Sequence, residues 1–338
     1  MNNSMVNTYK KISFRIRFVA TLAITVALLG FISSRLPTES KYQGGRKSQF
    51  WREKRSWSNC ADIVISGDSR SYRGIIPAEM QYGNESNLDI LNFGFSAVAF
   101  TEDYLVATKE VLKDNGARII LLGITPNSLT LGAARENGFT QTSQDLAAQS
   151  VAAPAFAPIL EALSPMHPRS FLNAVFGIQE NWRTRDGYYQ DFQVDGSIPS
   201  TRVPEVPDSA TPFYEELFSN NQVSEELIRD LLTFVSECSN SGIAVFALRV
   251  PTSEEVYNIE ERESGFDQEN FVKQFEFAGG EWLNIPTTGY QTYDGNHVHS
   301  NSAATLGLPR GEHYSNDAAA LSRKIGKMII PKSVINSN

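Results

Sequence analysis

The chain has 338 residues, of which 41% are apolar, 11% aromatic and 20% charged; this composition excludes a largely disordered protein and predicts a folded globular one. Its net charge of −8 is unevenly distributed, because residues 1–35 hold five basic residues and no acidic one, which leaves −13 for the remainder. This acidic charge of residues 36–338 argues against nucleic acid as a partner.

The N-terminal segment combines positive charge with an apolar run. Four basic residues precede residues 18–32, which carry no charge, and this order is typical of a segment that export machinery recognises. A helix of this length rises about 22 Å, and the flanking serines extend it toward the roughly 30 Å of a bilayer core. Cleavage after Ser34 would leave Ile32 where signal peptidases need a small residue. We therefore expect residues 1–17 to be a cytoplasmic tail and residues 18–34 an uncleaved transmembrane signal-anchor.

Basic residues flank the apolar run on both sides, so charge alone does not set its orientation. A long C-terminal domain can cross a membrane largely regardless of charge, and we expect a single-pass protein whose C-terminal domain is periplasmic or at the cell surface. Residues 35–58 are polar and basic and lack apolar periodicity, which predicts a tether; a surface helix of the domain is the alternative. The domain itself is expected over residues 59–338.

Apolar runs separated by helical patterns fill this domain. Strands are expected at residues 62–66, 88–93, 118–123, 243–248 and 282–285, and helices at residues 101–115, 225–238 and 316–329. Pro331 is expected to end the last helix. Strands and helices in alternation predict an α/β fold with a parallel sheet and right-handed crossovers. Residues 125–222 interrupt the alternation and are expected to form a large insertion that caps the carboxyl edge of the sheet.

The first expected strand ends abruptly in Gly67-Asp68-Ser69. Glycine permits a tight turn from strand to helix, and the polar pair lies at the carboxyl end of the strand, where open α/β sheets bind ligands. Asp68 and Ser69 are also favoured helix N-caps, which is the purely structural alternative. If Ser69 is a nucleophile, it requires a base within reach and an acid that orients the base.

Asp294 and His297 provide such an acid and base. They are three residues apart, after the last expected strand and therefore at the same edge of the sheet as Ser69. His313 is the alternative base, because a capping serine and the closing helix follow it; the tight Asp-x-x-His spacing favours His297. A metal site of Asp294, His297, His299 and His313 is a further alternative, since His-x-His suits zinc. It would take the base away from Ser69, so we expect no metal.

With these residues the chain resembles the SGNH (GDSL-like) hydrolase and acyltransferase superfamily over residues 62–127 and 243–330. The first block of the family is matched by Gly67-Asp68-Ser69, the glycine of the second block by Gly94, and the last block by Asp294 and His297. The resemblance implies a flavodoxin-like, doubly wound parallel sheet in three αβα layers.

The resemblance also implies an oxyanion site made of the Ser69 and Gly94 N–H groups and the Asn127 side chain. The third block departs from the family pattern, because Gly123-Ile-Thr-Pro-Asn127 stands where Gly-x-Asn-Asp is usual. Asn127 still follows the third expected strand, but its offset from Gly123 is longer, so its role as third donor is the weakest part of the match.

The activity implied is that of a serine esterase or O-acyltransferase with Ser69 as nucleophile, His297 as base and Asp294 as orienting acid, without a cofactor. Together with the membrane anchor, the chain looks most like the branch that acts on acylated, chiefly O-acetylated, envelope or exported glycans. Its expected partners are an acylated carbohydrate or other ester substrate, the membrane and the envelope polysaccharide machinery. The alternative is a catalytically inactive SGNH-fold module that binds or assembles envelope polysaccharide.

Cys60 and Cys238 are the only cysteines, and each precedes an expected strand at the amino edge of the sheet. An oxidising compartment would permit a disulfide between them. Two unpaired thiols are the preferred expectation, because spacing in the sequence does not supply the geometry that a disulfide demands.

Overall fold

The computed structural model describes residues 47–82, 88–144, 188–202, 204–300 and 316–335, together with Thr21 and Thr25. The expected cytoplasmic tail and, apart from these two threonines, the expected membrane anchor lie outside the described residues, as does His313. Within the part of the chain that the structure describes, no helix combines the length and the apolar content needed to cross a membrane.

Five parallel strands form the central sheet, in the spatial order β2-β1-β3-β6-β7. They are β2 (Ile90–Asn92), β1 (Ile63–Gly67), β3 (Ile119–Ile124), β6 (Ala244–Arg249) and β7 (Glu281–Trp282). The expected α/β class with a parallel sheet is confirmed, and the order is consistent with a flavodoxin-like fold. The apolar runs form strands because both of their faces are buried in a sheet of this kind.

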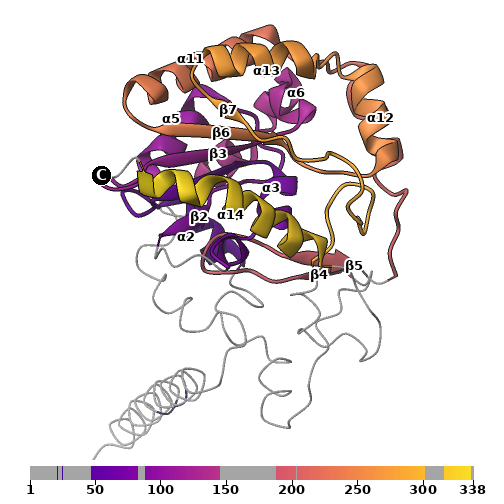
Figure 1. The fold of residues 1–338 in the computed structure, drawn as a ribbon. Helices are drawn as coiled ribbons and strands as arrows, with labels where there is room; N and C mark the ends of the chain where they lie inside the picture. The colour runs from indigo at the N-terminus through magenta and orange to yellow at the C-terminus, as the bar shows by residue number, and fades with distance from the viewer. Residues whose placement is uncertain are drawn as a thin grey trace, which may run out of the picture.

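Helices cover both faces of the sheet (Figure 1). They are α2 (Lys47–Arg55), α3 (Ser69–Gly74), α4 (Pro77–Met80), α5 (Glu102–Val111), α6 (Leu131–Arg135), α10 (Thr211–Ser219), α11 (Glu225–Asn240), α12 (Glu254–Glu263), α13 (Gln268–Phe277) and α14 (Asp317–Ile335), with a 3₁₀ turn η2 (Pro126–Leu129). Two further strands, β4 (Tyr188–Gln190) and β5 (Ser200–Arg202), pair antiparallel in a separate small sheet.

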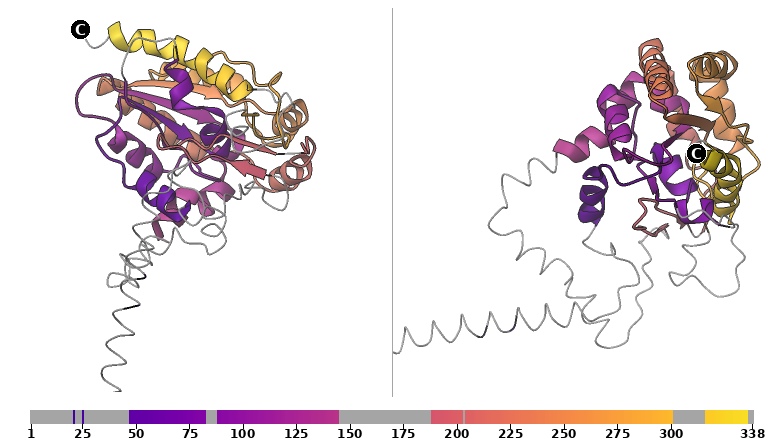
Figure 2. Two further views of the ribbon diagram at one scale, coloured as in Figure 1. Left: turned by 90° about the horizontal axis from the view of Figure 1, so that it is seen from below. Right: turned by 60° about the vertical axis from the view of Figure 1, so that its left-hand side comes forward.

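Alternate residues of each strand enter two different apolar clusters. Val64 and Ile120 pack with side chains of α5, α11 and α13, whereas Ile65 and Leu121 pack with α14. Figure 2 shows α14 and α5 on opposite sides of the sheet. The described core is therefore two apolar layers separated by the sheet.

The last helix does not end before Pro331, as expected, but continues to Ile335. A proline inside a helix removes one N–H hydrogen bond and kinks or breaks it unless other contacts compensate. Leu321, Ile325 and Ile329 of α14 are fully buried against the sheet. This packing fixes the helix before the proline and outweighs its local cost.

Residues 47–55, expected to belong to a tether, form α2 and pack against the domain. Phe50 and Lys54 of this helix are buried. Lys54 Nζ donates to the Gly196 carbonyl at 2.7 Å. It also lies 5.3–5.5 Å from the ring centroids of four aromatic residues, Phe50, Trp51, Tyr72 and Phe95. For this stretch the alternative of a helix belonging to the domain is the one observed.

Both cysteines are free thiols, in agreement with the preferred expectation. Cys238 is buried in the apolar cluster of α5 and α11, and Cys60 packs against the same cluster. They act as small apolar side chains there.

Candidate active site

Ser69, His297 and Asp294 meet at the carboxyl edge of the sheet and form one hydrogen-bonded series. Ser69 Oγ lies 2.9 Å from His297 Nε2, and His297 Nδ1 lies 2.7 Å from Asp294 Oδ2. A carboxylate only accepts hydrogen bonds, so Nδ1 carries the ring proton and Nε2 presents its lone pair to the serine hydroxyl. This is the arrangement in which an imidazole can accept the hydroxyl proton.

Local structure explains why the Ser69 side chain is available. Asp68, not Ser69, caps α3: its Oδ1 accepts from the Arg70 N–H at 2.9 Å and its Oδ2 from Thr125 Oγ1 at 2.6 Å. Ser69 is the first residue of the helix, and its N–H has no acceptor among the described residues. The purely structural alternative, in which both residues serve as caps, therefore accounts for Asp68 but not for Ser69.

The acid and base lie on a tight turn that neighbouring segments hold in place. Gly295 has φ +83° in the left-handed region, and a Cβ there would lie 2.1 Å from the Pro207 carbonyl oxygen, so only glycine fits. The Gly295 carbonyl accepts from Thr252 Oγ1 at 3.0 Å, just beyond β6. The Asp294 carbonyl accepts from the Ala210 N–H, just before α10, at 3.1 Å.

The pKa values of the pair suit a neutral base beside an ionised acid. Burial alone would raise the pKa of Asp294, but the charge of His297 and hydrogen bonds from His297 and Asn296 outweigh it and lower the pKa to about 2. Burial lowers the pKa of His297, and the Arg73 guanidinium lowers it further, against the opposing effect of Asp294. The imidazole is therefore neutral near pH 7, as a general base must be.

Arg73 is the cation nearest to the imidazole. Its Nη1 lies 3.3 Å from each ring nitrogen of His297 and donates to Tyr293 Oη at 3.2 Å. The Tyr293 ring stacks on the imidazole at 5.7 Å between centroids and 15° between planes. The Tyr188 hydroxyl of β4 lies 3.4 Å from that of Tyr293. A cation and two phenols thus line one side of the base.

Asn296 also contacts the base. Its Oδ1 accepts from Arg70 Nε at 2.5 Å and from the Tyr214 hydroxyl of α10 at 2.9 Å. Because two donors fix the oxygen, the amide Nδ2 faces His297 Nε2, at 3.2 Å. The basic ring nitrogen is therefore surrounded by donors, which favours its unprotonated state.

A buried ionic group supports Arg70. Its Nη2 lies 2.6 Å from Glu260 Oε1, and Arg249 Nη2 lies 2.9 Å from Glu260 Oε2. All three side chains are almost completely buried. Glu260 of α12 thereby connects Arg249 at the end of β6 with Arg70 of α3.

The two other expected oxyanion donors, the Gly94 N–H and the Asn127 side chain, do not contact the Ser69–His297–Asp294 series. The Gly94 N–H donates to Asn92 Oδ1 at 3.0 Å, and so it is already occupied in this conformation. Asn127 Oδ1 lies 3.5 Å from Thr130 Oγ1, and its Nδ2 has no acceptor among the described residues. In the described hydrogen-bond network Asn127 does not contact the triad. Of the three expected oxyanion donors, the Ser69 N–H and Asn127 Nδ2 are thus the two without an acceptor among the described residues.

Among the described histidines, His299 takes no part in this series. His299 Nδ1 lies 2.8 Å from Thr201 Oγ1 and its Nε2 lies 2.8 Å from Glu205 Oε1. His313 lies outside the described residues. Over the described ranges no three His, Cys, Asp or Glu side chains gather as a metal site.

Sequence reasoning missed Arg73, Asn296 and Arg70. The sequence pattern could have identified Arg73, because Ser69 and Arg73 are four residues apart on α3 and therefore share a helix face. The only sign of Asn296 in the sequence was its position between the acid and the base. Its amide orientation depends on Arg70, 226 positions away, and no local pattern reports such a contact.

No family model, curated protein or solved structure gives a significant match to this chain.

Proposed function

We propose that this protein is a serine esterase or O-acyltransferase of the SGNH type that acts on an acylated, chiefly O-acetylated, glycan. The single observation that carries the proposal is the series Ser69–His297–Asp294, with separations of 2.9 and 2.7 Å. A helix cap or a surface histidine would not require this series.

The reaction follows from these atoms. Ser69 Oγ attacks the acyl carbonyl carbon while His297 Nε2 takes the hydroxyl proton, and Asp294 stabilises the resulting imidazolium. The carbonyl oxygen becomes an oxyanion that the Ser69 N–H and Asn127 Nδ2 stabilise; one such donor is worth ~3 kcal/mol. The imidazolium then protonates the departing sugar oxygen. Water or a second sugar hydroxyl then attacks the acyl-serine and gives its proton to His297. His297 passes this proton to Ser69 Oγ as the acyl–serine bond breaks, and the free acid or the newly acylated sugar leaves.

The SGNH assignment rests on the order of the motifs and on their positions after different strands. Ser69 follows β1, Gly94 follows β2, Asn127 follows β3, and the acid–base turn comes last. The sheet order agrees with a flavodoxin-like, doubly wound fold. Agreement at the level of the fold supports an activity only together with the site.

The glycan substrate and the location are further parts of the proposal. The basic residues and the uncharged run at residues 18–32 support a retained membrane anchor with the domain outside the cytoplasm. An acyl-transfer site in that position would meet envelope or exported polysaccharide and the machinery that handles it.

Ser69→Ala tests the proposal directly. We expect the variant to lose covalent labelling by a fluorophosphonate and to lower turnover of an acetyl ester by several orders of magnitude, since removal of a triad serine costs on the order of 10⁶ in kcat. Labelling of the full-length protein followed by peptide mass mapping locates the modified residue. Ser96→Ala, an exposed serine after β2, is the matched control and should label normally.

The same assay decides the identity of the base. His297→Ala should lose labelling and turnover, whereas His313→Ala should keep both. Full labelling of Ser69→Ala, or loss confined to His313→Ala, would contradict the proposed triad. A wild-type protein that neither labels nor turns over an ester would instead support the inactive glycan-binding module.

A further inference from the structure

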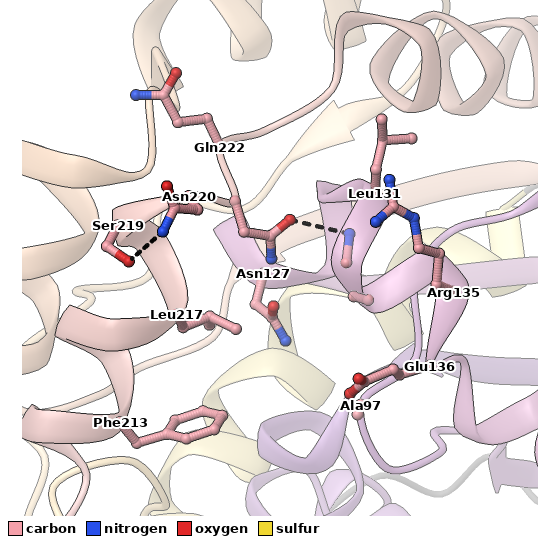
Figure 3. A pocket seen from close by; sticks show the side chains of 13 residues that line it. Ala97, Asn127, Leu131, Arg135, Glu136, Phe213, Leu217, Ser219, Asn220 and Gln222 are labelled. Carbon is pink, nitrogen blue, oxygen red and sulfur yellow. Dashed lines mark hydrogen bonds between the residues drawn. The ribbon is translucent and has the colours of Figure 1, made fainter.

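A groove of about 760 Å³ is lined by Asn127, the expected third oxyanion donor, and by none of the three residues of the Ser69–His297–Asp294 series. Figure 3 shows Phe213 and Leu217 of α10 on one side, Arg135 and Glu136 at the end of α6 on the other, and the Asn127 side chain between them. The five residues come from three separate segments, which the fold brings together after β3 and within the expected insertion.

Two features connect the groove with the triad. Asn127 lines it and is also the side chain proposed to bind the oxyanion. Helix α10 contributes Phe213 and Leu217 to the groove, while Tyr214 between them donates to Asn296 beside the base. Helix α10 therefore contributes both to the groove and to the position of the residue beside the base.

The lining favours a ligand that is polar but uncharged. Arg135 and Glu136 carry opposite charges side by side, so the groove has no excess of either sign to select a phosphate or a carboxylate. Figure 3 shows no hydrogen bond from Arg135, Glu136 or Asn127 to another of the residues drawn. These planar groups present both donors and acceptors, as recognition of neighbouring hydroxyl groups requires.

The groove also contains a largely exposed aromatic ring, whose contact within the fold is an edge-to-face one with Tyr214 at 5.3 Å between centroids. Phe213 is 57% exposed although it is a large apolar side chain, and Leu131 across the groove is 45% exposed. The face of a phenyl ring carries partial negative charge and attracts the polarised C–H groups of a sugar ring. A pyranose ring offers C–H groups on its face and hydroxyls at its edge, which matches a phenyl ring surrounded by planar polar groups.

We propose that this groove binds neutral pyranose units of the glycan, with Phe213 stacked on one sugar ring, and so selects the chain whose acyl group reaches Ser69. This inference rests on the proposed function for the identity of the substrate, but binding in the groove does not require an active triad. The two can therefore be tested separately.

Binding is measured with the full-length Ser69→Ala protein on immobilised neutral hexasaccharides of glucose, galactose, mannose and N-acetylglucosamine, with polygalacturonate and heparin as charged comparators. We expect binding to at least one neutral hexasaccharide, weakened at least tenfold by an added Phe213→Ala. Phe277→Ala is the matched control, because Phe277 is 94% exposed on α13 and lies outside the groove; its addition should change nothing.

No binding to any neutral hexasaccharide, binding that Phe213→Ala leaves intact, or preference for the charged polymers would overturn the inference. The far-UV circular dichroism and the thermal unfolding of the Ser69→Ala, Phe213→Ala protein should match those of Ser69→Ala, which shows that the double variant is folded. If binding is found but wild-type Ser69 never labels, the groove assignment stands and the proposed catalytic function fails.

Discussion

At the scale of single residues, Arg73 determines much of the character of the proposed base. Its Nη1 lies 3.3 Å from both ring nitrogens of His297, and its positive charge opposes protonation of the imidazole. Catalysis requires the neutral imidazole, so the active form predominates above the pKa of His297 and is lost as the pH falls through it. Lowering this pKa extends activity toward acid pH.

Replacing Arg73 with methionine should therefore shift the acid limb of the activity profile to higher pH, since the imidazolium is no longer repelled. The rate of fluorophosphonate labelling of Ser69, measured from pH 4 to 9, reports this shift even if the substrate is unknown. Arg323→Met, which removes an arginine paired with Glu79 on the surface, is the control and should keep the wild-type profile. An unchanged acid limb in Arg73→Met, or one moved to lower pH, would contradict this role.

The sequence predicted the three residues of the series but not the groups that tune them. Asp294 and His297 are close in the chain, and Ser69 ends a recognisable strand, so short patterns were sufficient. The contact of Arg73 with His297 joins positions 224 apart, and the Gly94 N–H is occupied by a neighbour two residues away. Both depend on side-chain placement that motifs do not encode.

At the scale of elements, strands were easier to predict than helices. The apolar runs of β1 and β3, rich in isoleucine, are buried on both faces, so composition alone marks them. Helices α6 and α10 lie in the expected insertion and were not predicted; α10 has only Tyr214 and Phe218 buried, too few to give a clear period. Helix α2 looked like a tether because its polar sequence hides the burial of Lys54.

The close approach of α3 to strand β3 depends on glycine at position 123. A Cβ there would lie 2.1 Å from Ser71 Oγ and 2.8 Å from Val250 Cγ2, both in closely packed surroundings. Gly123→Ala should therefore destabilise the protein by about 1–3 kcal/mol, the usual cost of overpacking. Gly74→Ala, where the nearest atom is 3.9 Å away, should not destabilise it.

Urea unfolding of both variants measures this difference, and adding Ser71→Gly to Gly123→Ala should recover part of the loss. Equal stability of Gly123→Ala and the wild type would show that α3 can move away from the sheet. That movement would also make the position of Ser69 less constrained than the structure indicates.

At the scale of the whole molecule, the parallel order of the sheet brings the site together. Ser69, Gly94 and Asn127 follow three adjacent strands, and all their segments emerge at one edge. This placement followed from alternating strands and helices in the sequence. The contribution of the insertion could not be predicted, since Phe213 and Tyr214 of α10 reach the groove and the base through contacts with distant segments.

The molecule as a whole is also expected to keep its N-terminal anchor. Ile32 stands where cleavage after Ser34 would need a small residue, so signal peptidase should leave the segment attached. Protein extracted from membranes with detergent should have an intact mass that includes residues 18–34. A mature chain that begins near residue 35 would show that the segment is a cleaved signal peptide.

The 228 positions that separate Ser69 from His297 also have a consequence in time. At about 5–20 residues per second, a ribosome makes the serine roughly 10–45 s before the histidine. During that interval the hydroxyl has no imidazole beside it, and Ser322, whose hydroxyl accepts from the Ile76 N–H at 2.8 Å, is made later still. A nascent chain therefore lacks the proposed base until residue 297 has been made. A product released before that point contains Ser69 without His297 and should not be labelled by a fluorophosphonate.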